Sequence, residues 1–157
     1  MEEHLRELLS TTRGVLLDSS ALLALHSEKY RRVLPVILRK TKAYVTMPTL
    51  VEVLTFMYYK QRVQDCHVIL DALVKLYTLI PLDSRLAVRA AQLYADLLRH
   101  NCVPAFVDVV NVAAALEENL VLVSAVTSNY KHYERYDLIA IDLEEFITAL
   151  ERILEKG

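Results

Sequence analysis

Two apolar patterns alternate along the chain. Short continuous apolar runs are typical of buried strands, and apolar residues recurring every three or four positions are typical of helices. The runs that predict strands lie at residues 15–18, 43–46, 79–80, 121–123 and 138–141. The helical pattern covers 2–12, 21–25, 28–40, 49–60, about 64–75, a long segment after Asp83, 105–118 and a final segment after Asp142.

This alternation predicts the fold class. Short, apolar strands separated by helices are typical of a parallel sheet covered on both faces. We therefore expect an α/β protein, a three-layer α/β/α fold around a central, mainly parallel sheet of short strands. The 157 residues predict one domain, with residues 1–13 as an N-terminal helical extension. Asn101 and Asn119 follow helical segments, where asparagine tolerates the left-handed conformation that ends a helix.

Composition and charge set limits on function. A hydrophobic content of 54% favours a compact globule over disorder. The net charge of −2 neither indicates nor excludes a nucleic-acid partner, because clustered carboxylates would mask a local basic groove. No apolar run reaches the roughly 20 residues that a membrane span needs, so we expect no membrane association. The acidic, amphipathic start is unlike a signal peptide and favours a cytoplasmic location.

Three carboxylates have apolar neighbours on both sides, namely Asp18, Glu52 and Asp108. A carboxylate in a dry environment costs several kcal/mol unless it is paired or bound to a cation. Several carboxylates brought together would also repel one another. A hard divalent cation such as Mg²⁺ removes both penalties, because it prefers carboxylate and water oxygens.

Each of these acids has an alternative interpretation. Asp18, with Ser19 and Ser20, would serve equally well as the cap of the following helix. Glu52 could point outward from a half-exposed helix, and Asp108 would gain from the dipole at a helix start. The order of the three is more informative than any one of them. One acid ends the first strand, one lies in the helix after the second, and one opens a buried helix before a later strand.

Three motifs carry a family resemblance. Residues 17–23 (LDSSALL) match an Asp-(Ser/Thr)-Ser opening segment, 48–54 (PTLVEVL) match a glutamate-bearing helix, and 106–116 (FVDVVNVAAAL) match an aspartate-led, alanine-rich helix. With these motifs the chain resembles the PIN-domain family over about residues 14–143, and is most similar to the VapC-like toxins of toxin–antitoxin pairs.

The resemblance implies a ribonuclease that depends on Mg²⁺ or Mn²⁺. Asp18, Glu52 and Asp108 would be its catalytic residues and metal ligands, with Ser20 in support. An antitoxin protein and a second copy of the chain would be its partners, and RNA its substrate.

One segment departs from the family pattern. After the fourth strand the family usually carries a further acid or an Asn, whereas Ala125 and Val126 stand there in this chain. With one gap in the alignment, Asn129 would come near the site as an uncharged supporting ligand. The departure leaves open a catalytically weakened or inactive PIN-like domain that binds RNA or protein. Another α/β metal hydrolase, such as a phosphatase, is a third possibility, although no Asp-x-Asp motif follows the first strand.

Basic and aromatic residues interleave at 58–62 and 130–136. Such segments could contact phosphates and stack bases, and Lys131 and Arg135 are the candidates for RNA binding. The alternative is that Tyr130, Tyr133 and Tyr136 pack on the sheet edge while the charges face water.

Overall fold

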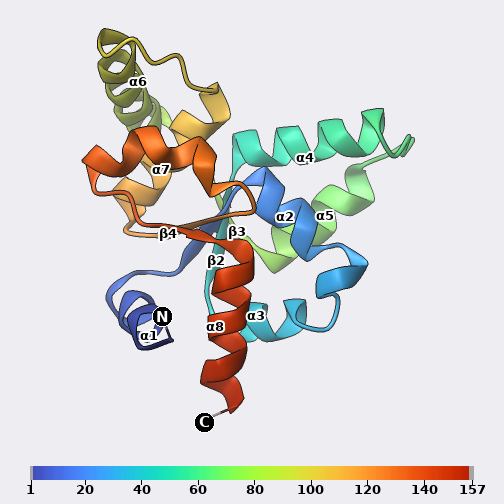
Figure 1. Cartoon of the computed structure of the whole chain (residues 1–157). Coiled ribbons are helices and arrows are strands. Elements are labelled where there is room, and N and C mark those ends of the chain that lie inside the picture. The colour runs from blue at the N-terminus through green and yellow to red at the C-terminus, as the bar shows by residue number, and fades with distance from the viewer. Residues whose placement is uncertain (1, 156–157) are drawn as a thin grey trace.

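A computed structural model describes residues 2–155 and has at its centre a five-stranded parallel sheet (Figure 1). The strands are β1 (Val15–Leu17), β2 (Ala43–Thr46), β3 (Thr78–Ile80), β4 (Val121–Ser124) and β5 (Ala140–Asp142). Their order in the sheet is β3-β2-β1-β4-β5, so β1 is the middle strand. Leu16 of β1 lies in register with Tyr44 of β2 and Leu122 of β4.

Helices cover both faces of the sheet, which confirms the three-layer α/β/α fold (Figure 1). One face is covered by α1 (Glu2–Thr11), α2 (Ser19–Leu25), α3 (Leu34–Lys40), α4 (Met47–Tyr59), α5 (His67–Leu76) and α8 (Leu143–Glu155). The other is covered by α6 (Ser84–Arg99), α7 (Phe106–Glu118) and the 3₁₀ segment η2 (Thr127–Tyr136). Successive strand residues point to opposite faces, so Val15 and Leu17 join the first core and Leu16 the second.

Three predicted elements differ from the structure. The helix expected over 28–40 is divided into a 3₁₀ turn, η1 (Glu28–Tyr30), and α3, because Pro35 has no amide hydrogen and lies in the first turn of a new helix. The fifth strand begins at Ala140, two residues later than expected, because its pairs with β4 run from Ala140 to Asp142. The segment η2 was not predicted as a helix, although its tyrosines recur every third residue, which is the 3₁₀ repeat.

Two residues at helix ends and one glycine have positive φ angles. Asn101 and Asn119 have φ angles of 58° and 52°, so both adopt the left-handed conformation predicted for them. Gly14, which precedes β1, has φ of 147°, and a Cβ there would overlap the carbonyl oxygen of Lys42. Glycine therefore lets β1 approach β2 at this point.

The N-terminal helix is part of the first core. Leu5 and Leu8 of α1 are buried there, and the Arg6 side chain donates a hydrogen bond to the Ile153 carbonyl of α8. Across residues 2–155, no helix has the length and apolar character that a membrane crossing requires.

Candidate functional site

The candidate site lies where the connections of the sheet change direction. From β1 the chain builds β2 and β3 on one side, then returns to place β4 and β5 on the other. In parallel α/β sheets, ligands bind at such a switch point, outside the carboxyl ends of the strands. Asp18 follows β1 there, and Ser124 ends the neighbouring β4.

Asp18 is both a helix cap and a buried carboxylate. Its Oδ1 accepts hydrogen bonds from the Ala21 amide at 2.8 Å and the Ser20 hydroxyl at 2.6 Å. The interpretation of Asp18 as a helix cap is therefore correct, and it accounts for Oδ1 alone. The residue is only 5% exposed, and its second oxygen, Oδ2, accepts a hydrogen bond from Tyr130 at 3.0 Å.

Ser20 connects this cap to β4. Its hydroxyl lies 3.2 Å from the Ser124 hydroxyl and accepts the Ala125 amide hydrogen at 3.0 Å. Ser20 therefore orients Asp18 and fixes the chain that leaves β4.

Asp108 lies in the first turn of α7 and faces Asp18. Its Oδ1 accepts a hydrogen bond from the same Tyr130 hydroxyl, at 3.3 Å. Burial raises the pKa of Asp108, and the charges of Asp18 and Glu52 raise it further, while the hydrogen bond from Tyr130 acts in the opposite direction. The structure thus brings together two acids that lie far apart in the sequence.

Glu52 is more exposed to solvent than Asp18 and Asp108. It is exposed on α4, and it is near enough to Asp108 for its charge to raise the pKa of that residue. Between α4 and α7, the buried Asn111 Oδ1 accepts hydrogen bonds from Thr46 at 2.5 Å and Thr49 at 3.1 Å. Thr49 and Asn111 each lie three residues from an acid, so this contact joins the turns of α4 and α7 that carry Glu52 and Asp108.

The donor chemistry fits a Mg²⁺ site that protein ligands fill only in part. Oxygens of Asp18 and Asp108 converge on one point, the Tyr130 hydroxyl. Within residues 2–155, no group of three His, Cys, Asp or Glu side chains is arranged to hold an ion. Mg²⁺ is commonly bound by one or two carboxylates, with waters and substrate phosphates completing its shell. Asp18 and Asp108 supply the two carboxylates of that mode.

No acid occupies the fourth position. The Val126 side chain is 44% exposed, and Asn129 is exposed in η2. Among the hydrogen bonds of the described residues, none joins the Asn129 side chain to Asp18 or Asp108. Tyr130, the next residue, contacts both acids instead. Its place at this site was missed in the sequence, where the only signal was the tyrosine repeat of η2.

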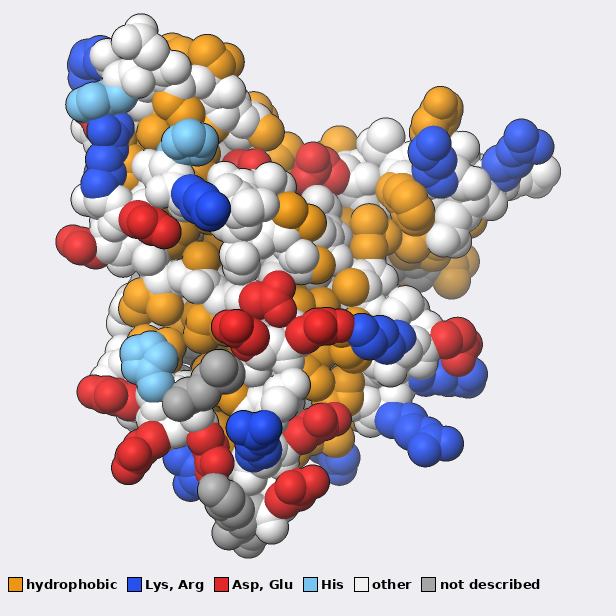
Figure 2. Space-filling model, in the orientation of Figure 1, with side chains coloured by type: hydrophobic (Ala, Val, Ile, Leu, Met, Phe, Trp, Pro, Cys, Tyr) orange, Lys and Arg blue, Asp and Glu red, His pale blue; other side chains and the backbone are white. Residues whose placement is uncertain are grey.

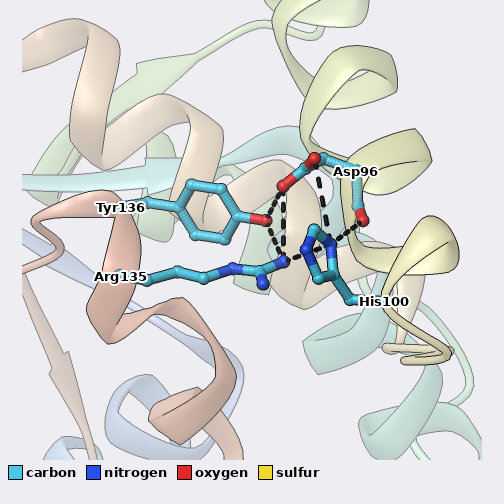
Figure 3. Close-up of polar contacts among 4 residues, drawn as sticks. All are labelled: Asp96, His100, Arg135 and Tyr136. Atoms are coloured by element: carbon cyan, nitrogen blue, oxygen red, sulfur yellow. Dashed lines mark hydrogen bonds and ion pairs between the residues drawn. The ribbon is translucent and has the colours of Figure 1, made fainter.

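The end of η2 is fastened to α6 by a polar cluster (Figure 3). Arg135 donates hydrogen bonds to Asp96 Oδ2 at 3.3 Å and to the Tyr136 hydroxyl at 2.6 Å, and Tyr136 donates to Asp96. The hydrogen bond from Tyr136 lowers the pKa of Asp96, as do the nearby charges of His100 and Arg135. These contacts hold η2, and with it Tyr130, against the second face of the sheet.

The two candidate RNA-binding residues differ in their contacts with other side chains. Lys131 is exposed, whereas Arg135 already has the partners in α6 and η2. Basic side chains are scattered among acidic ones over the face seen in Figure 2, so that face has no continuous basic surface. The buried Tyr130 and Tyr133 pack in the second core, as the packing alternative predicts.

Comparisons with known proteins agree with this fold. No family model matches the chain. A VapC ribonuclease of Pyrococcus furiosus is 30% identical over 139 residues, which span 88% of this chain and 92% of that protein.

Two solved structures are similar in fold. One is VapBC from Salmonella typhimurium bound to DNA, with a TM-score of 0.65 and 16% identity over 83% of this chain and 98% of that one. The other is VapBC2 from Rickettsia felis bound to a promoter DNA fragment, with a TM-score of 0.62 and 17% identity over 82% of this chain and 97% of that one. The sequence relative and the shared fold together show that the chain belongs to the VapC-like family of PIN-domain proteins.

Proposed function

We propose that the chain is a metal-dependent endoribonuclease of the toxin–antitoxin type, which hydrolyses RNA phosphodiester bonds with Mg²⁺ or Mn²⁺. The observation that carries the proposal is the convergence of Asp18 Oδ2 and Asp108 Oδ1 at the switch point of the sheet. The relationship to a VapC ribonuclease supports the same activity.

Each site residue has a separate task in this proposal. Asp18 and Asp108 would hold the cation, and Glu52, on the exposed side of α4, would position one of its waters. A bound cation would polarise a phosphoryl oxygen and make water a better nucleophile. Ser20 keeps Asp18 oriented through its hydrogen bond to Oδ1, which leaves Oδ2 available.

The proposal includes partners for the protein. The neighbouring folds were solved as VapBC complexes, which supports an antitoxin protein as the partner that restrains cleavage. A homodimer is expected from the resemblance, and light scattering on the purified protein tests it. A cytoplasmic location follows, because RNA and a newly made antitoxin are encountered there.

The test is RNA cleavage with and without Mg²⁺ or Mn²⁺. We expect Asp18→Asn and Asp108→Asn each to abolish metal-dependent cleavage while the fold is kept. Asp71→Asn on α5 is the matched control, since Asp71 is exposed and outside the site. Cleavage that survives both site substitutions would disprove the assignment.

A weakened domain that only binds RNA or protein is the second candidate. It is favoured by Val126 and the exposed Asn129, which leave the fourth position without an acid. Calorimetry with Mn²⁺ separates the candidates. Binding that Asp18→Asn removes supports the nuclease, and no binding at millimolar Mn²⁺, together with no cleavage, supports the binding module.

A further inference from the structure

Tyr130 lies between the two converging carboxylates. Its side chain is 2% exposed, and its hydroxyl oxygen is 3.0 Å from Asp18 Oδ2 and 3.3 Å from Asp108 Oδ1. A phenol carries one hydrogen, so it donates to one acid at a time or shares its hydrogen between them. The positive end of this O–H bond therefore points at the negative charge of both acids.

The contact involves the oxygen of Asp18 that a cation would need. Asp18 Oδ1 is already used by Ser20 and the Ala21 amide, which leaves Oδ2 as its available ligand atom. Tyr130 donates to that oxygen and to the facing oxygen of Asp108. A cation held by these two acids would compete with the hydroxyl hydrogen for the same oxygens.

The hydroxyl also reduces an unfavourable interaction. Two carboxylates that converge on one point repel each other, and a shared donor offsets part of that repulsion. A divalent cation would offset the same repulsion more completely. Hydroxyl and cation therefore perform the same task at the same two oxygens.

We infer that the Tyr130 hydroxyl takes the place of the cation in the metal-free protein and competes with Mg²⁺ or Mn²⁺ for Asp18 and Asp108. This inference rests on the proposed function, since it assigns those two acids to the metal. Tyr130 is thus a positioning residue that keeps Asp18 and Asp108 together when no cation is bound, at the cost of metal affinity.

Tyr130→Phe tests the inference directly, because it removes the hydroxyl and keeps the ring in the core. The cation must displace a hydrogen bond to charged groups in the wild type but not in the variant, so we expect Mn²⁺ to bind the variant about tenfold more tightly at pH 7.5, which is about 1.4 kcal/mol. The measurement is calorimetry with Mn²⁺ alone. Thermal melts in chelator should show the variant less stable than the wild type, with a larger gain on adding Mn²⁺.

Tyr133→Phe is the matched control. Tyr133 is a second buried tyrosine of η2, 6.0 Å from Tyr130 between ring centroids, and its hydroxyl has no hydrogen-bond partner among the described residues. Its substitution removes the same atom from the same core without removing a hydrogen bond from either acid. We expect unchanged Mn²⁺ affinity.

Each outcome decides between the proposals. Unchanged or weaker Mn²⁺ binding by Tyr130→Phe, alongside wild-type binding that Asp18→Asn abolishes, would overturn the inference and leave the proposed function standing. No binding by either protein would overturn both. If Tyr130→Phe does not fold, the tyrosine ultraviolet difference spectrum of the wild type replaces it. The chain has no tryptophan, and a spectrum unchanged by saturating Mg²⁺ would show that the hydroxyl is not displaced.

Discussion

The β1–α2 and β3–α6 junctions share one local structure and differ in everything around it. In each, a short strand is followed by a helix whose capping aspartate accepts a hydrogen bond at Oδ1 from the amide three residues later. Asp18 comes directly after β1, whereas Pro81 and Leu82 separate β3 from Asp83. The distance is 2.8 Å from Ala21 to Asp18 and 2.9 Å from Leu86 to Asp83. Both aspartates have the extended backbone of a helix cap. As caps, the two residues are equivalent.

Their positions in the sheet separate them. β3 is an edge strand and Asp83 is exposed, whereas β1 is the middle strand and Asp18 is 5% exposed. Asp18 also faces Asp108 across the Tyr130 hydroxyl. Capping is thus a local property of the sequence, and membership of the site is a property of the topology.

The largest difference between the two junctions is expected from substitutions that remove the charge of each aspartate and keep the helix cap. Asparagine caps a helix about as well as aspartate, so Asp18→Asn and Asp83→Asn should each change the free energy of unfolding by less than about 1 kcal/mol. Metal catalysis contributes several kcal/mol, so RNA cleavage should fall about 100-fold or more in Asp18→Asn. It should stay at the wild-type level in Asp83→Asn. Equal losses in the two variants would mean that the junctions do not differ in function.

The difference between the junctions explains what could be predicted from the sequence. The apolar runs predicted the five strands, because each strand is a short run of mainly apolar residues, including the edge strands β3 and β5 that are only partly buried. The acids were predicted by their charge among apolar neighbours and by the order of motifs around Asp18, Glu52 and Asp108. Each of these signals lies within a few residues of the feature it predicts.

The features of the site that could not be predicted depend on contacts between segments that lie far apart in the sequence. Tyr130 meets Asp18 across 112 positions of the sequence, and nothing beside Tyr130 distinguishes it from the core tyrosine Tyr133. The buried contact of Asn111 with Thr46 and Thr49 spans more than 60 positions. The interruption of the helix at Pro35 was a local signal that could have been used.

A smaller effect on cleavage is expected from a substitution in the buried contact between α4 and α7. Asn111→Ala would remove the acceptor that the buried hydroxyls of Thr46 and Thr49 share, and should lower the free energy of unfolding by about 3 kcal/mol. Cleavage should fall as well, because Glu52 and Asp108 lose their fixed spacing. Urea unfolding and the cleavage assay measure the two effects.

Asn119→Gly is the control for that substitution. It lies at the end of the same helix, has a left-handed backbone that glycine accepts, and makes only an exposed side-chain hydrogen bond to Thr11. We expect a change within about 0.5 kcal/mol and normal cleavage. An Asn111→Ala variant as stable as this control would show that the buried cluster does not hold α4 and α7 together.

The smallest effect concerns the pH dependence of stability without metal. The pKa of Asp108 is raised in the folded protein, first by burial and then by the charges of Asp18 and Glu52. The folded state therefore binds this proton more tightly than the unfolded chain, and the free energy of unfolding falls as the pH rises through the folded pKa. Asp108→Asn cannot lose that proton, and its amide oxygen can still accept the Tyr130 hydrogen bond. In chelator, the variant should melt a few degrees above the wild type at neutral pH and at the same temperature at strongly acidic pH.

The control for this prediction is Asp71→Asn, which should melt with the wild type at every pH. An Asp108→Asn variant that melts below the wild type at neutral pH would show that the charge on Asp108 stabilises the metal-free fold.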